Sequence, residues 1–246
     1  MIQVSEFSSL NFRDDWKLGF QQNVEYVQRF LPSDKIRIQY ITDDKTVLPY
    51  LTNHTTGEIK QLSPSVVFIG ETSESYEVVI ENNIQEDSCF TLSFRNDDEI
   101  LLESNFEVWM ELPDTILFEY TNRRNTLDTI FSDDRFVFRV EGAFLPQEIQ
   151  FTNETEDFRD QRFYSKLLSS TPYEQKKLTI GGAFGVPNWV ARKINYIFSL
   201  SSVHVDGKTM VRSEGSAIEG TIIGNFYPLY MYKITLEESK DYEENS

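Results

Sequence analysis

Carboxylates are the chemically reactive groups that this sequence supplies in greatest number. The chain of 246 residues contains 40 Asp and Glu, against two histidines and one cysteine. Glycoside hydrolysis needs two carboxyl groups held roughly 5 to 10 Å apart, and Glu103, Glu107 and Glu111 could be imagined as members of such a pair. They occur in a strand-like region, however, where outward acidic residues simply face solvent. We therefore predict no catalytic residues and expect that the protein is not an enzyme.

Three acidic turns could offer oxygen ligands to calcium: Asp43-Asp44, Asp97-Asp98-Glu99 and Asp133-Asp134. None of them has the spaced Asp, Asn and Gly followed by a distant Glu that a dedicated calcium loop requires. Aspartate is also common in turns because its side chain bonds nearby backbone groups. The sequence therefore predicts solvated turns here and no metal site.

The histidines and the cysteine are isolated along the chain. Neither His54 nor His204 belongs to a zinc-binding motif, and the alternation of His204 with two valines predicts a surface position on a strand. Cys89 opens an apolar strand, where a buried thiol with no basic neighbour is inert. One cysteine also excludes an internal disulfide. Residues 214–218 do not match the glycine-flanked elbow of a serine nucleophile.

A glycine-rich segment at 181–185 deserves comparison with phosphate-binding loops, because it lies between a predicted strand at 177–180 and a predicted helix from Pro187. The lysine and hydroxyl of a P-loop are absent, and proline removes a backbone N–H from the helix N-terminus where an anion would dock. Glycine is the usual residue wherever φ must be positive. We predict a structural turn and no cofactor.

Aromatic residues are concentrated in the last predicted strand, which includes Tyr227, Tyr230 and Tyr232. Rigid amphipathic rings suit protein interfaces and also stack on sugar rings. We take these three tyrosines as candidate interface residues, with packing inside the chain's own core as the alternative.

The net charge of −17 limits the possible partners. It opposes the attraction to phosphates on which most non-specific nucleic-acid affinity depends, and it repels anionic membrane surfaces. No apolar run approaches the ~18 residues that cross a bilayer, and the first residues lack the pattern of a signal peptide. We expect neither nucleic acid nor membrane as a partner, and synthesis in the cytoplasm.

Hydrophobic residues recur mainly with a period of two, as in strands with one buried face. Residues 1–112 are predicted to form an antiparallel β-sandwich, and residues 16–31 to be mostly extended. The best strands of this half are at 35–41, 66–69, 76–80, 89–94 and 105–110. Two further alternating runs, at 116–120 and 136–140, place Arg135, Arg139 and Glu141 on a face expected to be solvated.

Residues 113–246 are predicted to form an α+β half packed directly on the sandwich. Because strands outnumber helices in both halves, the predicted fold class of the whole chain is mainly β. A helix is expected at about 187–200, with Trp189 and Ile194 on its apolar stripe. A second helix is expected at 163–169, with Leu167 and Leu168 buried. Asp206-Gly207 accepts positive φ and predicts a hairpin at 203–211. A strand at 227–236 then precedes an acidic tail that is expected to fray.

A series of short phrases follows one another along the chain. In chain order they are YVQRFL at 26–31, DKIRIQ at 34–39, DTIF at 128–131, FVFRVEG at 136–142, FRDQ at 158–161, LLSSTPY at 167–173, KLTIGG at 177–182, GVPNW at 185–189, KIN at 193–195, VDG at 205–207 and RSEGS at 212–216. In this order the phrases resemble uncharacterised proteins encoded in the tail or virion modules of phages and prophages of Bacteroides-like bacteria. The resemblance spans most of the chain and carries no catalytic motif.

The resemblance implies a non-enzymatic virion structural protein, in the tail or baseplate region, that acts through protein–protein contacts. Its expected partners are copies of itself in a ring-like assembly and other virion proteins, and its expected location is the virion. The main alternative is a carbohydrate- or receptor-binding surface module, in which exposed aromatics stack on glycans and acidic loops bind calcium. A hydrolase of cell-wall sugars would need two carboxyl groups converging in a cleft.

Overall fold

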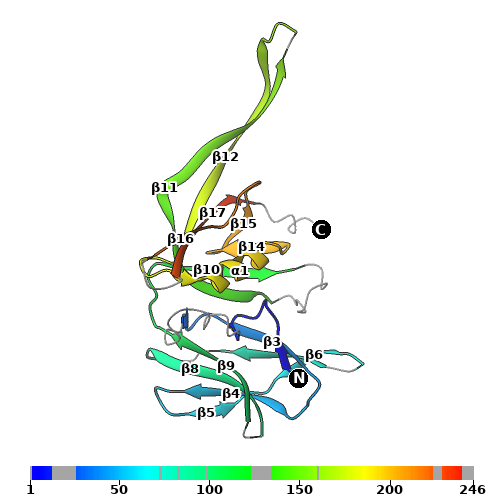
Figure 1. Cartoon of the computed structure of the whole chain (residues 1–246), viewed down its shortest axis with the longest axis vertical. Helices are drawn as coiled ribbons and strands as arrows, with labels where there is room; N and C mark the ends of the chain where they lie inside the picture. The colour runs from blue at the N-terminus through cyan, green and yellow to red at the C-terminus, as the bar shows by residue number, and fades with distance from the viewer. Residues whose placement is uncertain are drawn as a thin grey trace.

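Two β-sheet halves lie one above the other along the longest axis of the chain in a computed structural model, and a long hairpin projects from one end (Figure 1). The structure describes residues 2–12, 26–71, 74–81, 84–97, 99–122, 134–159, 161–223 and 229–239. Within these residues most positions belong to strands, which confirms the predicted mainly β fold.

The first half is a sandwich of two sheets. One sheet has the order β1-β3-β7-β6, built from β1 (Ile2–Val4), β3 (Ile36–Thr42), β7 (Glu74–Ile80) and β6 (Ser65–Ile69). The other has the order β2-β9-β8-β4-β5, built from β2 (Gln28–Phe30), β9 (Glu99–Val108), β8 (Ser88–Asn96), β4 (Val47–Asn53) and β5 (Ile59–Gln61). Neighbouring strands are antiparallel except β2 and β9, which are parallel.

Alternation along these strands explains the sandwich, because successive side chains point to opposite faces. Phe90, Leu92 and Phe94 of β8 are buried between the sheets. The ring of Phe90 stacks on that of its cross-strand partner Phe106, with 5.3 Å between centroids. Such aromatic cross-strand pairs fix the register of a sheet as well as filling its core.

The second half is a sheet that closes on itself. Its main path runs β12-β11-β10-β14-β15-β17, and β12 then pairs with β17 again. The strands are β10 (Thr115–Thr121), β11 (Phe136–Arg159), β12 (Ser165–Ile180), β14 (Ser202–Val205), β15 (Lys208–Arg212) and β17 (Leu229–Glu238), and two short strands, β13 (Val186–Pro187) and β16 (Glu219–Ile222), also pair with β17. Helix α1 (Asn188–Ile197) packs its apolar stripe into the core of this half.

Two elements of this half, the helix and one hairpin, were predicted correctly from short sequence motifs. Pro187, with φ −70° and ψ 160°, precedes the first turn of α1, and Trp189 and Ile194 are buried on the predicted face. Asp206 and Gly207 have φ values of 48° and 75° in the tight turn between β14 and β15. These positive angles are what the two-residue hairpin requires.

The helix predicted at 163–169 is absent, and its sequence instead forms the turn and first residues of β12. Leu167 and Leu168, which were expected to be buried, are 56% and 55% exposed. Two adjacent leucines fit a helix face or a strand equally well. Pairing of β12 with β11, in which Leu167 lies opposite Asp157, decides the conformation here.

A buried ion pair joins the two halves. Arg139 of β11 donates from Nε and Nη2 to the two carboxylate oxygens of Asp34, at 2.6 and 2.8 Å, and the side chains are 9% and 2% exposed. Arg139 was predicted to face solvent, and this is wrong because the sandwich covers that face of β11. Apolar residues cross the same boundary: Phe7 packs in the core of the second half and Val137 in that of the first.

Candidate functional site

The carboxylates that could have formed a catalytic pair serve structural roles or face solvent. Glu107 accepts hydrogen bonds from Arg29 Nε at 3.1 Å and from Trp109 Nε1 at 2.9 Å. Glu103 and Glu111 are exposed. In the described part of the chain, no group of three or more His, Cys, Asp or Glu side chains is placed to hold a metal ion.

Asp44 illustrates what the acidic turns do. Its carboxylate accepts the backbone N–H of Thr46 at 2.9 Å and the side-chain amide of Asn96 at 2.8 Å. The hydrogen bonds from Thr46 lower the pKa of Asp44 below its ordinary value. The carboxylate therefore orders its own turn, as short acidic side chains commonly do.

The burial of His204 and of Cys89 is the reverse of what the sequence predicts. His204 is buried, with Nε2 3.1 Å from Thr209 Oγ1, because both faces of β14 are covered. Cys89 is exposed and not buried. Partial desolvation and then the charge of Glu107 raise its pKa, so the thiol stays protonated at neutral pH and is a poor nucleophile.

The glycine-rich segment is the structural turn that the sequence predicted. Gly181, Gly182 and Gly185 have φ values of 104°, 45° and 77°. The N–H of Gly181 donates to Glu141 O at 2.8 Å, and a Cβ at Gly181 would lie 2.7 Å from Tyr230 O. The segment thus needs glycine both for its backbone angles and for its close approach to β17.

Of the three candidate interface tyrosines, Tyr227 lies outside the described residues and Tyr230 is partly buried. Tyr232 is 6% exposed, and its hydroxyl is 3.2 Å from Asn188 Oδ1. Burial, followed by the proximity of Tyr230, raises the pKa of Tyr232 to about 12. An interface role for these residues stays a prediction, and Tyr232 has little surface to offer a partner.

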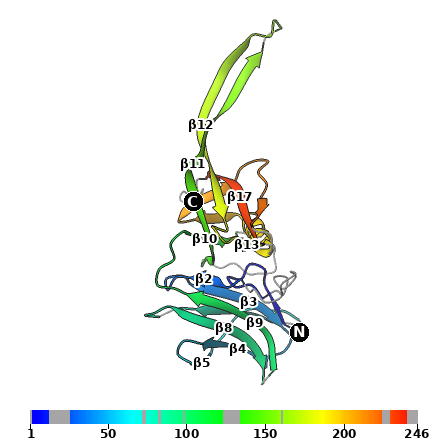
Figure 2. The ribbon, with the colours of Figure 1, turned by 60° about the vertical axis from the view of Figure 1, so that its left-hand side comes forward.

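Exposed apolar side chains gather instead on the projecting hairpin, which we call the arm and define as residues 151–174. It consists of the outer parts of β11 and β12, paired from Phe151↔Glu174 to Arg159↔Ser165. Nine residues of strand span roughly 30 Å at about 3.4 Å each. Figures 1 and 2 show that the arm stands away from both halves in two views.

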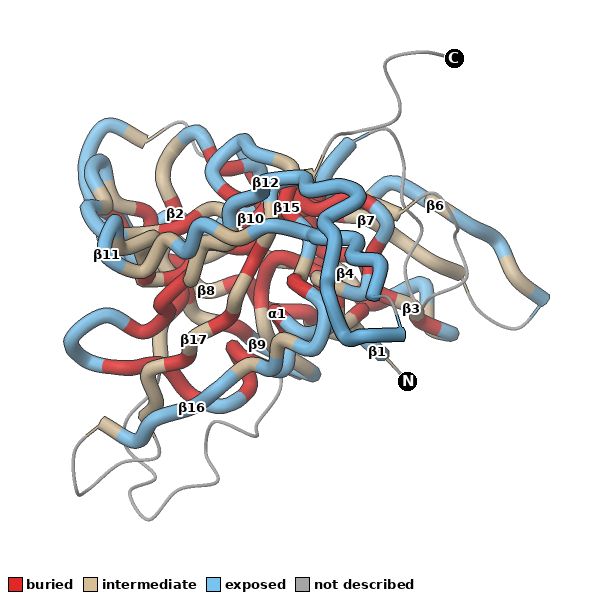
Figure 3. The backbone as a smooth tube through the Cα atoms, turned by 90° about the horizontal axis from the view of Figure 1, so that it is seen from above, coloured by how far each residue is buried: buried red, intermediate tan, exposed pale blue. Residues whose placement is uncertain are grey.

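Both faces of the arm are open to solvent. The large apolar side chains with more than a third of their surface exposed are Phe151 (79%), Phe158 (57%), Phe163 (83%), Tyr164 (71%), Leu167 (56%), Leu168 (55%) and Tyr173 (37%). At ~200 Å² for each aromatic side chain, the five rings alone present on the order of 600 Å². Figure 3, which looks along the long axis, shows that the buried stretches lie within the two halves, which together we call the body.

This exposed area is comparable with the upper end of the range for the largest apolar patch of an ordinary monomer, which is about 300 to 600 Å² and is often functional. The arm also has two open edges, since none of the described strands pairs with either of its sides beyond Gln175↔Glu237. A two-stranded ribbon alone is only marginally stable in water. The arm is therefore the candidate interaction surface of the described chain.

Polar contacts from β17 hold the base of the arm. Lys176 Nζ donates to Glu238 Oε2 at 2.9 Å, and Gln175 Nε2 donates to Glu237 Oε1 at 2.9 Å. Glu148, which lies in an irregular stretch of β11 just before the arm, is ion-paired with Lys233. The hydrogen bond from Lys233 lowers the pKa of Glu148 below its ordinary value.

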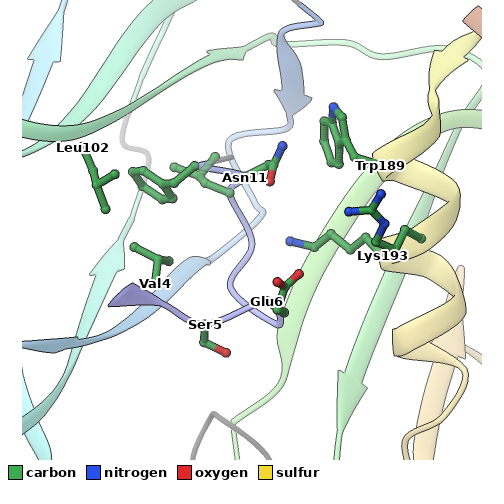
Figure 4. A pocket seen from close by; sticks show the side chains of 10 residues that line it. Val4, Ser5, Glu6, Asn11, Leu102, Trp189 and Lys193 are labelled. Carbon is green, nitrogen blue, oxygen red and sulfur yellow. The ribbon is translucent and has the colours of Figure 1, made fainter. Parts of the chain in front are cut away.

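Two cavities in the described part of the chain are further candidate sites. The first has a volume of about 190 Å³ and lies between the N-terminal segment and α1, where Glu6 and Lys193 extend toward each other (Figure 4). Lys193 is buried there, and its Nζ donates to the carbonyl of Ser8. This cavity is small and crossed by the polar contacts that join the halves.

The second cavity, which we call the end cavity, has a volume of about 680 Å³ and lies in the sandwich. Its lining combines apolar side chains with acidic ones from the β4–β5 turn and the connection between β7 and β8. They include Leu51, Ile84 and Phe90 among the apolar residues, and Glu58, Glu81 and Glu86 with Lys60 among the charged ones.

No helix in the described part of the chain has the length and apolar character that a membrane span requires. Comparison of the chain with protein-family models, with curated proteins and with solved structures finds no match.

Proposed function

We propose that this protein is a structural subunit of a bacteriophage particle, situated in the tail or baseplate region, and that it works by binding other proteins of the particle. The support from sequence is the series of phrases that resembles phage tail-module proteins. Two of these phrases, FRDQ at 158–161 and LLSSTPY at 167–173, fall in the arm. The resemblance therefore includes the segment with the largest exposed apolar surface.

The arm is the observation on which the proposal depends. Extending residues 151–159 and 161–174 into solvent orders a ribbon that buries almost nothing within its own chain. Ordering the backbone costs about 1 to 2 kcal/mol per residue in conformational entropy, and an assembly that covers the exposed rings would recover part of it. A binding subunit needs such a surface, whereas an enzyme does not.

The charge of the chain suits the same role. A net charge of −17 keeps separate subunits soluble through mutual repulsion, even with exposed aromatic rings. Local contacts of opposite sign can then overcome this repulsion where subunits meet. The acidic composition is thus compatible with a protein that stays dispersed until it joins a larger particle.

The direct test is mass spectrometry of particles purified from the phage or prophage that encodes this chain. We expect the protein in the particle, in several copies per particle. Its absence from purified infectious particles would refute the proposal. A variant that lacks the arm should be produced and folded but missing from the particle, which separates loss of binding from loss of folding.

A receptor- or carbohydrate-binding module is the second candidate, because Phe163 and Tyr164 at the end of the arm are 83% and 71% exposed and could stack on a sugar ring. Binding of the purified protein to a glycan array, lost when both rings are replaced by serine, would favour this role. If a calcium chelator also abolished that binding, acidic loops would be implicated as well.

A further inference from the structure

The end of the arm differs in charge from the rest of the protein. Residues 158–168 contain three basic side chains, Arg159, Arg162 and Lys166, against the single acidic residue Asp160. This segment therefore carries a net charge of +2 in a chain of −17, which leaves −19 for the remainder. We call residues 158–168 the tip; closer to the base of the arm, Glu154, Glu156 and Asp157 are acidic.

The tip combines this positive charge with large exposed apolar groups. Phe158, Phe163, Tyr164, Leu167 and Leu168 are each more than half exposed. A surface that is both basic and aromatic is complementary to one that is acidic around an apolar floor, because the rings lose water while the charges attract.

The end cavity has these complementary properties. Glu58, Glu81 and Glu86 supply three carboxylates to its lining, against one ammonium group from Lys60. Glu81 is also ion-paired with Lys35 at 3.6 Å, so Glu58 and Glu86 are the carboxylates that give the lining its acidic character. Its apolar lining includes Ile84 and the edge of the sandwich core. A volume of about 680 Å³ is within the range that takes up drug-sized ligands, so it can admit aromatic side chains.

The tip and the end cavity cannot meet within one molecule. The arm projects from the second half, whereas β4 and β5, whose connection carries Glu58, lie at the opposite end of the long axis (Figures 1 and 2). A basic apolar tip at one end and an acidic apolar cavity at the other are the two sides of a head-to-tail contact. Such a contact leaves a pair of copies with one free tip and one free cavity, so it continues from copy to copy.

We propose that the tip of the arm docks into the end cavity of a second copy of this chain. Arg159 and Lys166 face the carboxylates of Glu58 and Glu86 in that contact, and the exposed rings of the tip cover the apolar floor of the cavity. Repetition of the contact gives a closed ring or an open stack, depending on the rotation between copies. The proposal deepens and rests on the proposed function, since it names the partner of the arm.

Charge reversal on each side tests the contact. The arm variant carries Arg159→Glu and Lys166→Glu, and the cavity variant carries Glu58→Lys and Glu86→Lys. Sedimentation velocity over a range of protein concentrations, at about 0.05 M salt where screening is weak, measures self-association. The wild type should form species larger than a monomer, and each variant should associate at least about tenfold more weakly.

Restoring complementarity is the decisive step. The chain that carries all four substitutions has an acidic tip and a basic cavity, and it should associate as the wild type does. An equimolar mixture of the two double variants should also associate more strongly than either variant does alone. The control variant Glu214→Lys with Glu219→Lys changes the net charge as the cavity variant does, at two exposed residues of the second half, and should behave as the wild type.

Three outcomes would overturn the docking proposal: a wild type that stays monomeric throughout, association that survives both reversals, or reversals that weaken association without rescue in the four-substitution chain. Crosslinking of the tip to a different particle protein would also overturn the docking proposal, because that protein, and not a second copy, would then be the partner of the tip. The proposed function is judged separately, from the presence of the chain in purified particles. If the chain is found in particles but its self-association is insensitive to these reversals, the proposed function stands and the docking contact is refuted.

Discussion

Two hairpins of the second half, β14–β15 and β11–β12, share a local design and differ in their surroundings. In the β14–β15 hairpin, β14 lies between β10 and β15, and all four of its residues are buried. In the β11–β12 hairpin, the outer nine residue pairs have no neighbouring strand in the described structure and are almost wholly exposed. Both have the residue types and pairing of ordinary β structure. Neighbouring strands therefore decide which hairpin is buried in the stable body and which stays exposed to solvent.

Removing a large side chain from the body should have the greatest effect. Trp189 is buried in the core of the second half, with its ring 6.3 Å from that of Phe138. Trp189→Ala should lower the free energy of unfolding by about 3 to 5 kcal/mol, because the deletion leaves a cavity. Chemical denaturation followed by intrinsic fluorescence and circular dichroism measures the loss. An unchanged midpoint would contradict the burial of this ring.

A smaller loss is expected where the body needs glycine. Gly181→Ala forces a residue with a side chain to φ 104°, with its Cβ 2.7 Å from Tyr230 O, and should cost about 2 kcal/mol or more. Gly57 is the matched control, because it also has a positive φ, of 76°, but nothing lies within 4 Å of an added Cβ. Gly57→Ala should cost about 1 kcal/mol. Equal costs in thermal denaturation would argue against the close approach at Gly181.

Acid should loosen the base of the arm before the body. Lys233 lowers the pKa of Glu148 and Lys176 lowers that of Glu238, so these ionised contacts favour the folded state above the ordinary carboxyl pKa. The stabilisation is lost as the pH falls through the lowered folded-state values. Amide hydrogen exchange, expressed as protection factors, should therefore show falling protection at Ile149 and its neighbours below about pH 4.

Amide hydrogen exchange of the Glu148→Gln variant over the same pH range isolates the contribution of this carboxylate. The variant should show weaker protection at neutral pH and a smaller change on acidification than the wild type. Glu154→Gln removes an equal charge from an exposed position further along the arm and should leave the pH profile unchanged. Identical profiles for all three proteins would show that the contact with Lys233 does not hold the base of the arm.

Substitution at the tip should have the smallest effect on stability. Phe163 is 83% exposed, so Phe163→Ser should change the free energy of unfolding by less than about 0.5 kcal/mol. Thermal denaturation of the monomer checks this. A loss comparable to that of Trp189→Ala would mean that the arm packs on the body in solution, and would remove the contrast between the two hairpins.

The body was predictable from sequence where short-range rules determine the outcome. Alternation placed the main strands of the sandwich, Asp206-Gly207 placed a turn, and Pro187 placed the start of α1, because each signal acts within a few residues. The failed predictions concern long-range contacts. Arg139 and His204 are buried by elements distant in sequence, and alternation identifies a face of a strand without showing what covers it.

The arm was missed for the same reason. Leu167 and Leu168 are apolar, so burial was the ordinary expectation, and the sequence does not distinguish a core residue from one reserved for another chain. The candidate tyrosines were chosen on residue type alone, and Tyr232 proved to be buried against Asn188. The three basic residues Arg159, Arg162 and Lys166 in an acidic chain are the sequence signal that distinguishes this segment.

The continuity of β11 gives the arm a mechanical consequence. One strand runs from Phe136 to Arg159, with an irregular stretch between Phe144 and Ile149, and it contains both Arg139, which is anchored to Asp34 of the sandwich, and the first residues of the tip. Tension applied at the tip by a bound neighbour travels along this single strand into the opposite half of the molecule. Resistance to forced separation depends on the unfolding rate, so a pull on the arm should be borne by the whole protein and not by the hairpin alone.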